Sequence, residues 1–347
     1  VRIEQAPATD LYATGDMAIG FAGEFGVPSF LMPLVEASAM KIAQIGNLQT
    51  TGGSASIRFT GQLGMRVAGA AAREMLLQCA AERWGVPTGE CTTALSYVHH
   101  NASGQSSSYG ELADAAARLE PPEEPTLKQR TQFNIMGKAM SRVDIPAKVD
   151  GSAFYGLDYN TDDMLFAAIR LAPVFGTKLV SVDATEALKR RGVKKVIELK
   201  DSVAVVADNY WRAKEALKVV EAQFERSVND TVSSADIAAR FDSELARSAG
   251  SEDFEAGDAE TNLNQAGEIV EASYRVPYLA HAPMEPMNCT VHIQNGRADV
   301  WTSTQDPLAV RGRVASIAGL NERAVTHHPS YLGGGFGRRL PFNWNVI

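Results

Sequence analysis

Four glycines lie within five residues near the end of the sequence, at positions 333–335 and 337. Glycine lets a backbone approach a ligand closely and adopt positive φ, so successive N–H groups there can converge on an anion or an oxo group. Arg338 and Arg339 follow directly and would add positive charge for a phosphate. A tight turn without a ligand explains the same glycines equally well.

Two familiar phosphate-binding patterns do not fit this glycine loop. No Gly-Lys-Ser/Thr follows it, as the phosphate loop of NTPases requires. No third glycine stands at the offset of the dinucleotide fingerprint. A nucleotide-binding protein that uses the loop for phosphates in some other way stays open as an alternative.

Gln305 stands where a strand is expected to end and a helix to begin. Asp306 and Pro307 follow it and provide a helix cap and a first-turn proline. Ligands collect at strand ends and helix N-termini in α/β folds. A carboxamide there could donate a hydrogen bond to a metal-bound oxygen, although an exposed glutamine beside a cap is the commoner case.

Histidine, carboxylate and thiol side chains lie close together at His281, Glu285 and Cys289. Their spacing matches no metal motif, and the prolines and methionines between them favour a rigid structural loop. The histidine pairs at 99–100 and 327–328 are adjacent residues, which face opposite sides of a strand and rarely share a metal. We therefore predict no direct metal ligand in this chain. No Ser-His-Asp or Cys-His arrangement for nucleophilic catalysis is found either.

The bulk composition narrows the class of protein. A chain of 347 residues predicts two or three domains, and a net charge of −8 argues against nucleic acid as a partner. Three cysteines without paired spacing give no disulfide framework, zinc site or iron–sulfur motif. No apolar run approaches the roughly 20 residues of a membrane-spanning helix. Neither end carries a terminus signal, so we expect both to be cut.

The first third of the sequence predicts two helices. Apolar residues recur every fourth position over 65–81, which is helical spacing. A second helix is expected after Ser108, because Glu111 three residues later completes a capping box. The segment Glu120 to Pro125 holds three prolines and is a linker candidate. Thr50 to Ser54 is a loop signal.

The remaining sequence predicts a compact α/β unit and a second strand-rich section. Short apolar runs with strand chemistry lie at 164–169, 179–182, 193–199 and 203–207. Helices are expected after Asp183, running to Gly192, and after Asp208 and Ser234. Residues 250–266 are acidic and polar and predict a surface loop, strands return from about 268, and Asn295-Gly296 favours a type I′ hairpin.

The order of these segments resembles one known family. Residues 142–151, 155–158, 164–165, 172–173 and 203–208 resemble the a/b hammerhead domain of the xanthine dehydrogenase and aldehyde oxidase family. Residues 281–288, 302–305 and 333–337 resemble the start of that family's first molybdenum-binding domain. Residues 1–135 resemble the N-terminal extension of the isoquinoline 1-oxidoreductase β-subunit branch. The motifs that carry this resemblance are residues 51–54, 70–76, 84–87 and 108–112.

The resemblance implies an α+β multidomain fold, with an a/b hammerhead domain and part of the molybdenum-binding α/β domains. The division it implies is an N-terminal extension contributing to the molybdenum-binding region at 1–135 and the hammerhead domain at 136–226. A helix and acidic linker follow at 227–267, and the first molybdenum-binding domain starts at 268–347.

The resemblance also implies a reaction. In this family a molybdenum–pterin centre hydroxylates an aldehyde or an electron-poor ring carbon, with oxygen taken from water. The implied cofactor is molybdopterin with molybdenum, as the cytosine dinucleotide. Electrons would leave through iron–sulfur clusters on a small [2Fe-2S] subunit, with a cytochrome c or flavin subunit as a further partner. The implied compartment is the periplasm rather than the cytoplasm.

Site residues follow from the family pattern. Gln305 would hydrogen-bond a ligand of the metal, and Phe336 would also face the substrate. The full set of cofactor-binding residues implied is Gln305, Gly334, Gly335, Phe336, Gly337, Arg338, Thr51, Gly52, Gly53 and Ser54.

One feature of the family pattern is missing. Its general base is a glutamate in a downstream Gly-Glu loop, which deprotonates the metal-bound hydroxyl. No such loop occurs here, and the pattern gives Glu285 a structural place. We therefore expect no catalytic residue in this chain and a remaining C-terminal part that supplies the base. A non-catalytic scaffold or anion-binding module with the same fold is the alternative.

Overall fold

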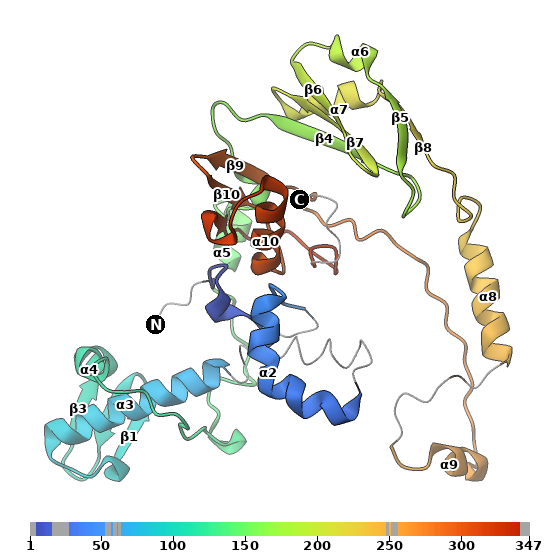
Figure 1. Ribbon diagram of the computed structural model, residues 1–347. Coiled ribbons are helices and arrows are strands. Elements are labelled where there is room, and N and C mark those ends of the chain that lie inside the picture. Colours follow the sequence, from blue (N-terminus) through green and yellow to red (C-terminus); the bar gives the residue numbers. More distant parts are fainter. Residues whose placement is uncertain are drawn as a thin grey trace. The chain divides into compact units, whose positions relative to one another are not determined.

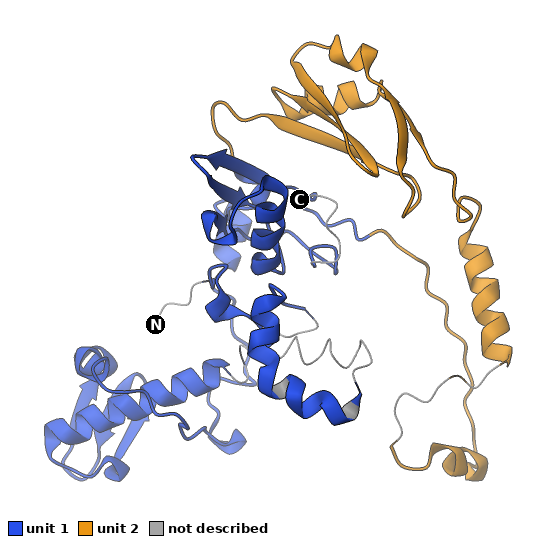
Figure 2. Ribbon diagram, viewed as in Figure 1, with its two compact units in different colours: residues 1–159, 281–347 blue, residues 160–280 orange. Residues whose placement is uncertain are grey.

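Short strands and helices alternate along the chain in the computed structural model, which describes residues 5–15, 28–52, 57, 61, 64–247, 250 and 256–340 (Figure 1). They form two units, residues 1–159 with 281–347 and residues 160–280 (Figure 2). This is the mixed α+β fold that the sequence predicts. The finer domain boundaries at 135, 226 and 267 stay predictions. Within the described residues, no helix combines the length and apolar character needed to cross a membrane.

The first part of unit 1 is helical and then forms a small α/β layer. Its elements are η1 Asp10–Tyr12, η2 Ser29–Leu31, α2 Met32–Ile45, α3 Arg66–Trp84, η4 Thr88–Glu90, β1 Cys91–Ala94, β2 Tyr97–His100, β3 Gln105–Ser108 and α4 Tyr109–Ala116. The three strands form an antiparallel sheet in the order β1-β2-β3. A core that includes Leu76, Val98 and Leu112 joins α3 and α4 to this sheet. The helix predicted at 65–81 is confirmed, and it ends where Gly85 adopts a φ of 67°.

The predicted capping box at the start of α4 is confirmed. The Ser108 N–H donates to Glu111 Oε2 at 2.7 Å, and the Glu111 N–H donates to Ser108 Oγ at 3.3 Å. These bonds hold the pKa of the Glu111 carboxyl below its ordinary value. Two N–H groups that the helix cannot satisfy therefore have partners.

Ser108→Ala is expected to destabilise the protein by about 1 kcal/mol, because the N-cap acceptor is lost. The measurement is the midpoint of urea unfolding, followed by circular dichroism. Ser106→Ala, at an exposed position in the same strand, is the control and should change stability by less than about 0.5 kcal/mol. Equal effects of the two substitutions would contradict the role of the cap.

Unit 2 contains the α/β unit predicted from the short apolar runs. Its strands are β4 Phe166–Leu171, β5 Leu179–Asp183, β6 Val193–Glu198, β7 Ser202–Ala207 and β8 Glu221–Phe224, with α6 Thr185–Leu188 and α7 Tyr210–Leu217. Antiparallel pairing gives one sheet in the order β4-β7-β6 and a second of β5 and β8. The central strand β7 is almost wholly buried, and α7 packs on β4 and β7 (Figure 1). The continuous apolar run of β7 is typical of a strand covered on both faces.

Two helix limits in this unit differ from the sequence prediction. The helix after Asp183 ends at Leu188, four residues before Gly192. Gly192 has a φ of 83°, and a Cβ there would overlap the side chain of Asp208, so it belongs to a turn. The cap of α7 is Asn209, whose side chain accepts from the Arg212 N–H at 2.9 Å, and not Asp208.

The rest of unit 2 consists of two helices, and the first of them buries less apolar surface than predicted. Helix α8 spans Ser234–Arg247, and its cap is Ser233, whose Oγ accepts from the Asp236 N–H at 3.2 Å. The predicted apolar face of α8 is exposed, since Phe241 is 54% and Leu245 is 80% accessible. A short helix, α9 Ala259–Gln265, lies within the predicted surface loop. It is stabilised by the Asp258 carboxylate, which accepts from the Thr261 N–H at 2.9 Å.

The strands predicted from about 268 do not form there. Residues 266–283 form neither helix nor strand and pair with no described strand, and the next strand begins at Thr290. Apolar side chains along this segment are exposed, among them Val270 at 87% and Tyr274 at 90%. Strand chemistry alone is therefore insufficient, because a strand needs a neighbour to satisfy its backbone groups.

The last part of unit 1 brings strand ends and loops together. Its strands are β9 Thr290–Gln294, β10 Arg297–Trp301 and β11 Val325–His328, with the helix α10 Pro307–Ala318 and the short turns η5 Arg130–Gln132, α5 Ile145–Asp150, η6 Gly156–Asp158 and η7 Glu322–Ala324. β10 lies between β9, which is antiparallel, and β11, which is parallel. The predicted hairpin is confirmed by positive φ at Asn295 and Gly296. The predicted cap is also confirmed, since Asp306 accepts from the Ala309 N–H at 3.0 Å.

Candidate functional site

Four loops meet around the start of α10. They are the loop that precedes β9, the turn from β10 into α10, the glycine loop after β11 and the segment after α2. Residues 285, 303, 305, 333 and 339 are joined by hydrogen bonds in this region. Residue patterns alone gave Gln305 and the glycine loop as separate candidates, the family resemblance grouped them, and the fold brings them together.

Gln305 is fixed by its backbone and its amide. Its N–H donates to the Arg339 carbonyl at 3.1 Å, and its Nε2 donates to the Thr51 carbonyl at 2.7 Å. Its Oε1 is buried and has no hydrogen-bond partner among the described residues. A Cβ on Gly335 would lie only 2.9 Å from that oxygen. The side chain thus presents a buried, unpaired acceptor to the glycine loop.

Three positions in the glycine loop require glycine for different physical reasons. A Cβ on Gly333 would overlap the side chain of Glu285. Gly334 and Gly337 have φ values of 101° and 86°, which strain any other residue. Part of the glycine clustering therefore serves packing inside the chain rather than a ligand.

Phe336 lies at the tip of the loop in an unusual conformation. Its φ is 52° and its side chain is 75% exposed. A bulky residue at positive φ costs free energy and is common at functional sites. The N–H groups of Gly334, Gly335 and Phe336 have no acceptor in the described part of the chain.

The two arginines after the loop have different environments. Arg338 is partly exposed, as a contact to an anion would need. Arg339 is buried and forms an ion pair with Glu285, with 2.9 Å between Nη2 and Oε2. The suggestion that Arg339 supplies charge for a phosphate is therefore wrong, because its charge is already neutralised inside the fold.

Glu285 occupies the centre of this network. It accepts from the Ser303 hydroxyl at 2.7 Å, the Gly333 N–H at 3.0 Å and the Asn288 amide at 3.0 Å. Burial raises the pKa of this carboxyl, but the hydrogen bonds and the Arg339 charge outweigh burial and hold the pKa below its ordinary value. Glu285 is therefore an ionised structural group, in agreement with its expected structural place.

A second buried carboxylate joins the segment after α2 to α10. Asp306 is fully buried and accepts from the Thr50 hydroxyl and, at 3.1 Å, from the Gln49 N–H. Here burial dominates and raises the pKa above the ordinary value for Asp, against the effect of its hydrogen bonds. Sequence analysis identified Asp306 only as a cap and missed this contact, because Thr50 lies 256 residues away.

The loop after α2 is described only in part. The Thr51 N–H donates to the Gln305 carbonyl at 2.8 Å. A Cβ on Gly52 would make only ordinary contacts, 3.8 Å from Leu340 and 3.9 Å from Gln305. Gly53 and Ser54 lie outside the described residues. Thr51 and Gly52 therefore lie beside Gln305, as a shared site would require.

The histidines and cysteines are held by contacts within the fold. Within the described ranges, no three His, Cys, Asp or Glu side chains are grouped so as to hold a metal ion. His100 bonds Ser103 and Glu90, whereas His327 bonds the Thr302 carbonyl. Burial raises the pKa of the Cys289 thiol to about 12. His100 and His327 therefore serve hydrogen bonds within the fold.

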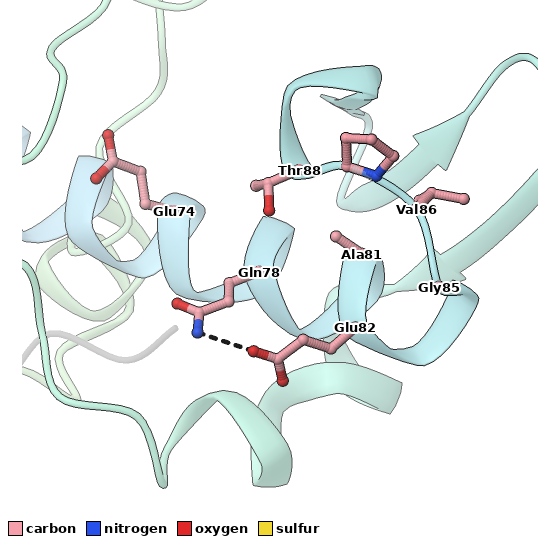
Figure 3. Close-up of a pocket in the computed structure, with 8 residues that line it drawn as sticks. Glu74, Gln78, Ala81, Glu82, Gly85, Val86 and Thr88 are labelled. Carbon is pink, nitrogen blue, oxygen red and sulfur yellow. Dashed lines mark hydrogen bonds between the residues drawn. The ribbon is translucent and has the colours of Figure 1, made fainter.

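An open groove beside α3 is lined by none of these residues. It is lined by Glu74, Gln78, Ala81, Glu82, Gly85, Val86, Pro87 and Thr88 (Figure 3). The Gln78 amide donates to Glu82 at 2.9 Å, and Glu74 accepts from the Thr126 N–H at 2.7 Å. No arginine or lysine lines it, so it does not offer an anionic cofactor a counter-charge.

The region around Gln305 fits a polar cofactor better. Among the described residues it combines a buried acceptor and three N–H donors that have no partner, next to glycines without side chains. Buried polar groups in folded proteins usually have partners. Their lack of partners here is what an absent polar ligand would explain.

Comparison with known proteins identifies a domain and several relatives. A family model described as the molybdopterin cofactor-binding domain matches residues 242–346. Isoquinoline 1-oxidoreductase subunit beta from Brevundimonas diminuta is 30% identical over 328 residues, covering 80% of this chain and 41% of that protein. A membrane-bound aldehyde dehydrogenase from Gluconacetobacter polyoxogenes, whose name specifies pyrroloquinoline quinone, is 29% identical over 308 residues, covering 84% of this chain and 40% of that protein.

Among solved structures, quinoline 2-oxidoreductase from Pseudomonas putida 86 is similar with a TM-score of 0.43 and 18% identity, covering 60% of this chain and 32% of that one. The chain spans about two fifths of the length of the two curated relatives, 41% and 40%. The matched domain contains both Gln305 and the glycine loop. The chain belongs to the family of molybdenum-cofactor-binding subunits that includes the β subunit of isoquinoline 1-oxidoreductase.

Proposed function

We propose that this chain supplies one wall of the active site of a molybdenum-dependent oxidoreductase that acts on an aldehyde or an N-heterocycle. The carrying observation is that Gln305 Oε1 and the nearby N–H groups of Gly334, Gly335 and Phe336 have no hydrogen-bond partner among the described residues. When bound, the molybdopterin cofactor supplies two-electron oxidation with oxygen from water. The names of the two relatives, one an isoquinoline and one an aldehyde enzyme, support this substrate class.

The chain's own residues would then bind and orient. Gly334, Gly335 and Gly337 let the backbone approach the cofactor, and Arg338 offers it a counter-charge. Phe336, held exposed by its backbone, would border the substrate. Thr51 and Gly52 would contact the pterin side, with Gly53 and Ser54 adjoining them in sequence.

The remaining parts of the reaction would come from elsewhere. A carboxylate base would lie in a further C-terminal part of the subunit, since the described carboxylates at the site, Glu285 and Asp306, already accept internal hydrogen bonds. Electrons would pass to a small [2Fe-2S] subunit and then to a cytochrome c or flavin subunit. The cytosine dinucleotide form and a periplasmic location are part of the same proposal.

The test is the metal content and activity of the full complex. We expect molybdenum and pterin in stoichiometric amount after maturation, by mass spectrometry and fluorescence of the oxidised pterin. Turnover is then measured with a panel of aldehydes and N-heterocycles and an artificial acceptor dye. A complex without molybdenum would contradict the proposal and leave a non-catalytic scaffold, whereas bound pyrroloquinoline quinone would point to the cofactor named for the aldehyde relative.

Gln305→Ala is expected to lower kcat/KM by about 10- to 100-fold, the equivalent of one hydrogen bond to a charged group. Steady-state kinetics of the complex, with molybdenum content measured on the same sample, provide the check. Gln294→Ala, at an exposed position at the end of β9, is the matched control. An unchanged kcat/KM in Gln305→Ala at equal molybdenum content would remove Gln305 from the site.

A further inference from the structure

We infer that the buried pair of Glu285 and Arg339 is a positioning device, which holds the glycine loop in register with Gln305 so that the cofactor is retained. Neither residue needs to touch the cofactor. The inference rests on the proposed function, because it concerns how the same site is held. It assigns Arg339 a role that its position directly after the loop does not suggest.

The pair is closed off from water. The side chains of Arg339 and Glu285 are 0% and 5% exposed. Every polar atom of the guanidinium has an acceptor. Nη1 donates to the Ser303 carbonyl and hydroxyl at 3.1 and 2.7 Å, Nη2 donates to the Glu285 carbonyl at 2.8 Å, and Nε donates to the Gly334 carbonyl at 2.8 Å. One side chain therefore bonds three different loops.

Both ends of the glycine loop are attached to this pair. At the first end, Glu285 and Gly333 exchange two hydrogen bonds of 3.0 Å, one through the Glu285 carboxylate and one through its backbone N–H. At the other end, the Arg339 side chain reaches back to the Gly334 carbonyl. Between these two attachments lie Gly335 and the exposed Phe336, whose N–H groups have no acceptor in the described part of the chain.

The same pair also fixes Gln305. The Arg339 carbonyl accepts the Gln305 N–H at 3.1 Å, while the Arg339 guanidinium and the Glu285 carboxylate both bond the Ser303 hydroxyl. The distance between Gln305 and Gly335 is thus set by Arg339, which directly follows the glycine loop and bonds the turn from β10 into α10. A shift of Arg339 would move Gln305 and the glycine loop relative to each other.

Geometry, rather than stability, explains why an ion pair stands here. A buried ion pair is often no more stabilising than apolar side chains of the same volume. What it adds is direction, because a planar guanidinium presents its donors at fixed angles and a lysine ammonium does not. Groups that orient a cofactor-binding residue without touching the ligand commonly change affinity by about 10- to 100-fold.

The test compares two Arg→Lys substitutions in the full complex. Arg339→Lys keeps the positive charge but loses the planar guanidinium with its several N–H donors at fixed angles. Arg311→Lys is the matched control, since Arg311 is also a mostly buried arginine of unit 1. Its hydrogen-bond partners in the described part of the chain are the Ala8 carbonyl, Asp10 at 2.7 Å and Glu322 at 3.3 Å, and none of these belongs to the glycine loop. The amounts of molybdenum and pterin per complex are measured during dialysis. The melting temperature and the electron paramagnetic resonance signal of the metal are measured on the same samples.

We expect Arg339→Lys to release molybdenum and pterin at least about tenfold faster than the unchanged complex and to alter the resonance signal of the metal that stays. Arg311→Lys should keep its molybdenum and pterin, even if its melting temperature falls as far as that of Arg339→Lys. Equal retention in the two variants would overturn the inference. If Arg339→Lys does not fold, Glu285→Gln, which keeps the side-chain size, is compared with Arg311→Lys in the same way. A wild-type complex without molybdenum would instead refute the proposed function.

Discussion

Replacing Glu285 with alanine is expected to destabilise unit 1 by about 3–5 kcal/mol, because it leaves the Arg339 charge buried without its partner. The carboxylate also accepts from Ser303, Gly333 and Asn288, so three further donors lose their acceptor. The measurement is the urea midpoint of unit 1, followed by fluorescence of Trp301, which stacks on Tyr159 at 3.8 Å.

The control for this substitution is Glu90→Ala. Glu90 also pairs with a buried cation-forming group, His100 at 3.0 Å, but its own side chain is 56% exposed. Solvent screens such a pair, and its loss should cost less than about 1 kcal/mol. Similar losses for the two variants would mean that the Glu285 pair is not desolvated as described.

The pH dependence of Glu285 follows from its lowered pKa. A carboxyl whose pKa is lower in the folded state stabilises the fold above its ordinary pKa. That contribution is lost as the pH falls through the lowered value. The Glu285→Ala variant should therefore differ most from the unchanged protein at neutral pH and differ less under acid conditions.

Asp306→Ala is expected to cost about 3 kcal/mol, the sum of a lost helix cap and buried donors left without acceptors. Asp306→Asn should cost less than about 1 kcal/mol, because its carbonyl can still accept from the Ala309 and Gln49 N–H groups. Its amide can donate to the Thr50 hydroxyl, which lies against the same side chain. Thermal and urea unfolding of the two variants measure the difference.

The pH dependence of Asp306 has the opposite sign. Its pKa is raised in the folded state, so the folded protein binds the proton more tightly than the unfolded chain. Stability contributed by this group is complete below the ordinary Asp pKa of about 3.9 and is lost as the pH rises through the raised value. Asp306→Asn should thus gain stability relative to the unchanged protein as the pH rises above about 4. A difference that does not vary with pH would contradict the raised pKa.

The sequence determined the elements whose causes are local. The capping box of Ser108 and Glu111, the Asn295-Gly296 hairpin and the Asp306-Pro307 start of α10 all form as predicted. In each, the interacting atoms lie within a few residues, so their chemistry can be read directly along the chain. The order of the motifs was also sufficient to indicate the family.

Where local chemistry needs a distant partner, the sequence was insufficient. Residues 268–283 have strand chemistry but form no strand in the described chain, because strand hydrogen bonds must be made to another segment. Phe241 and Leu245 have the spacing of a buried helix face and are exposed. Periodicity predicts which face is apolar, but only packing decides whether it is covered.

Only the tertiary structure decided which charged residues belong to the inside of the site. Arg338 and Arg339 are identical in type and adjacent, yet Arg338 is partly exposed and Arg339 is buried against Glu285, 54 residues away in sequence. Asp306 likewise reaches a partner 256 residues away. The free energy of a charge depends on its solvation and its partners, and both are set by the folded arrangement rather than by the neighbouring residues in the chain.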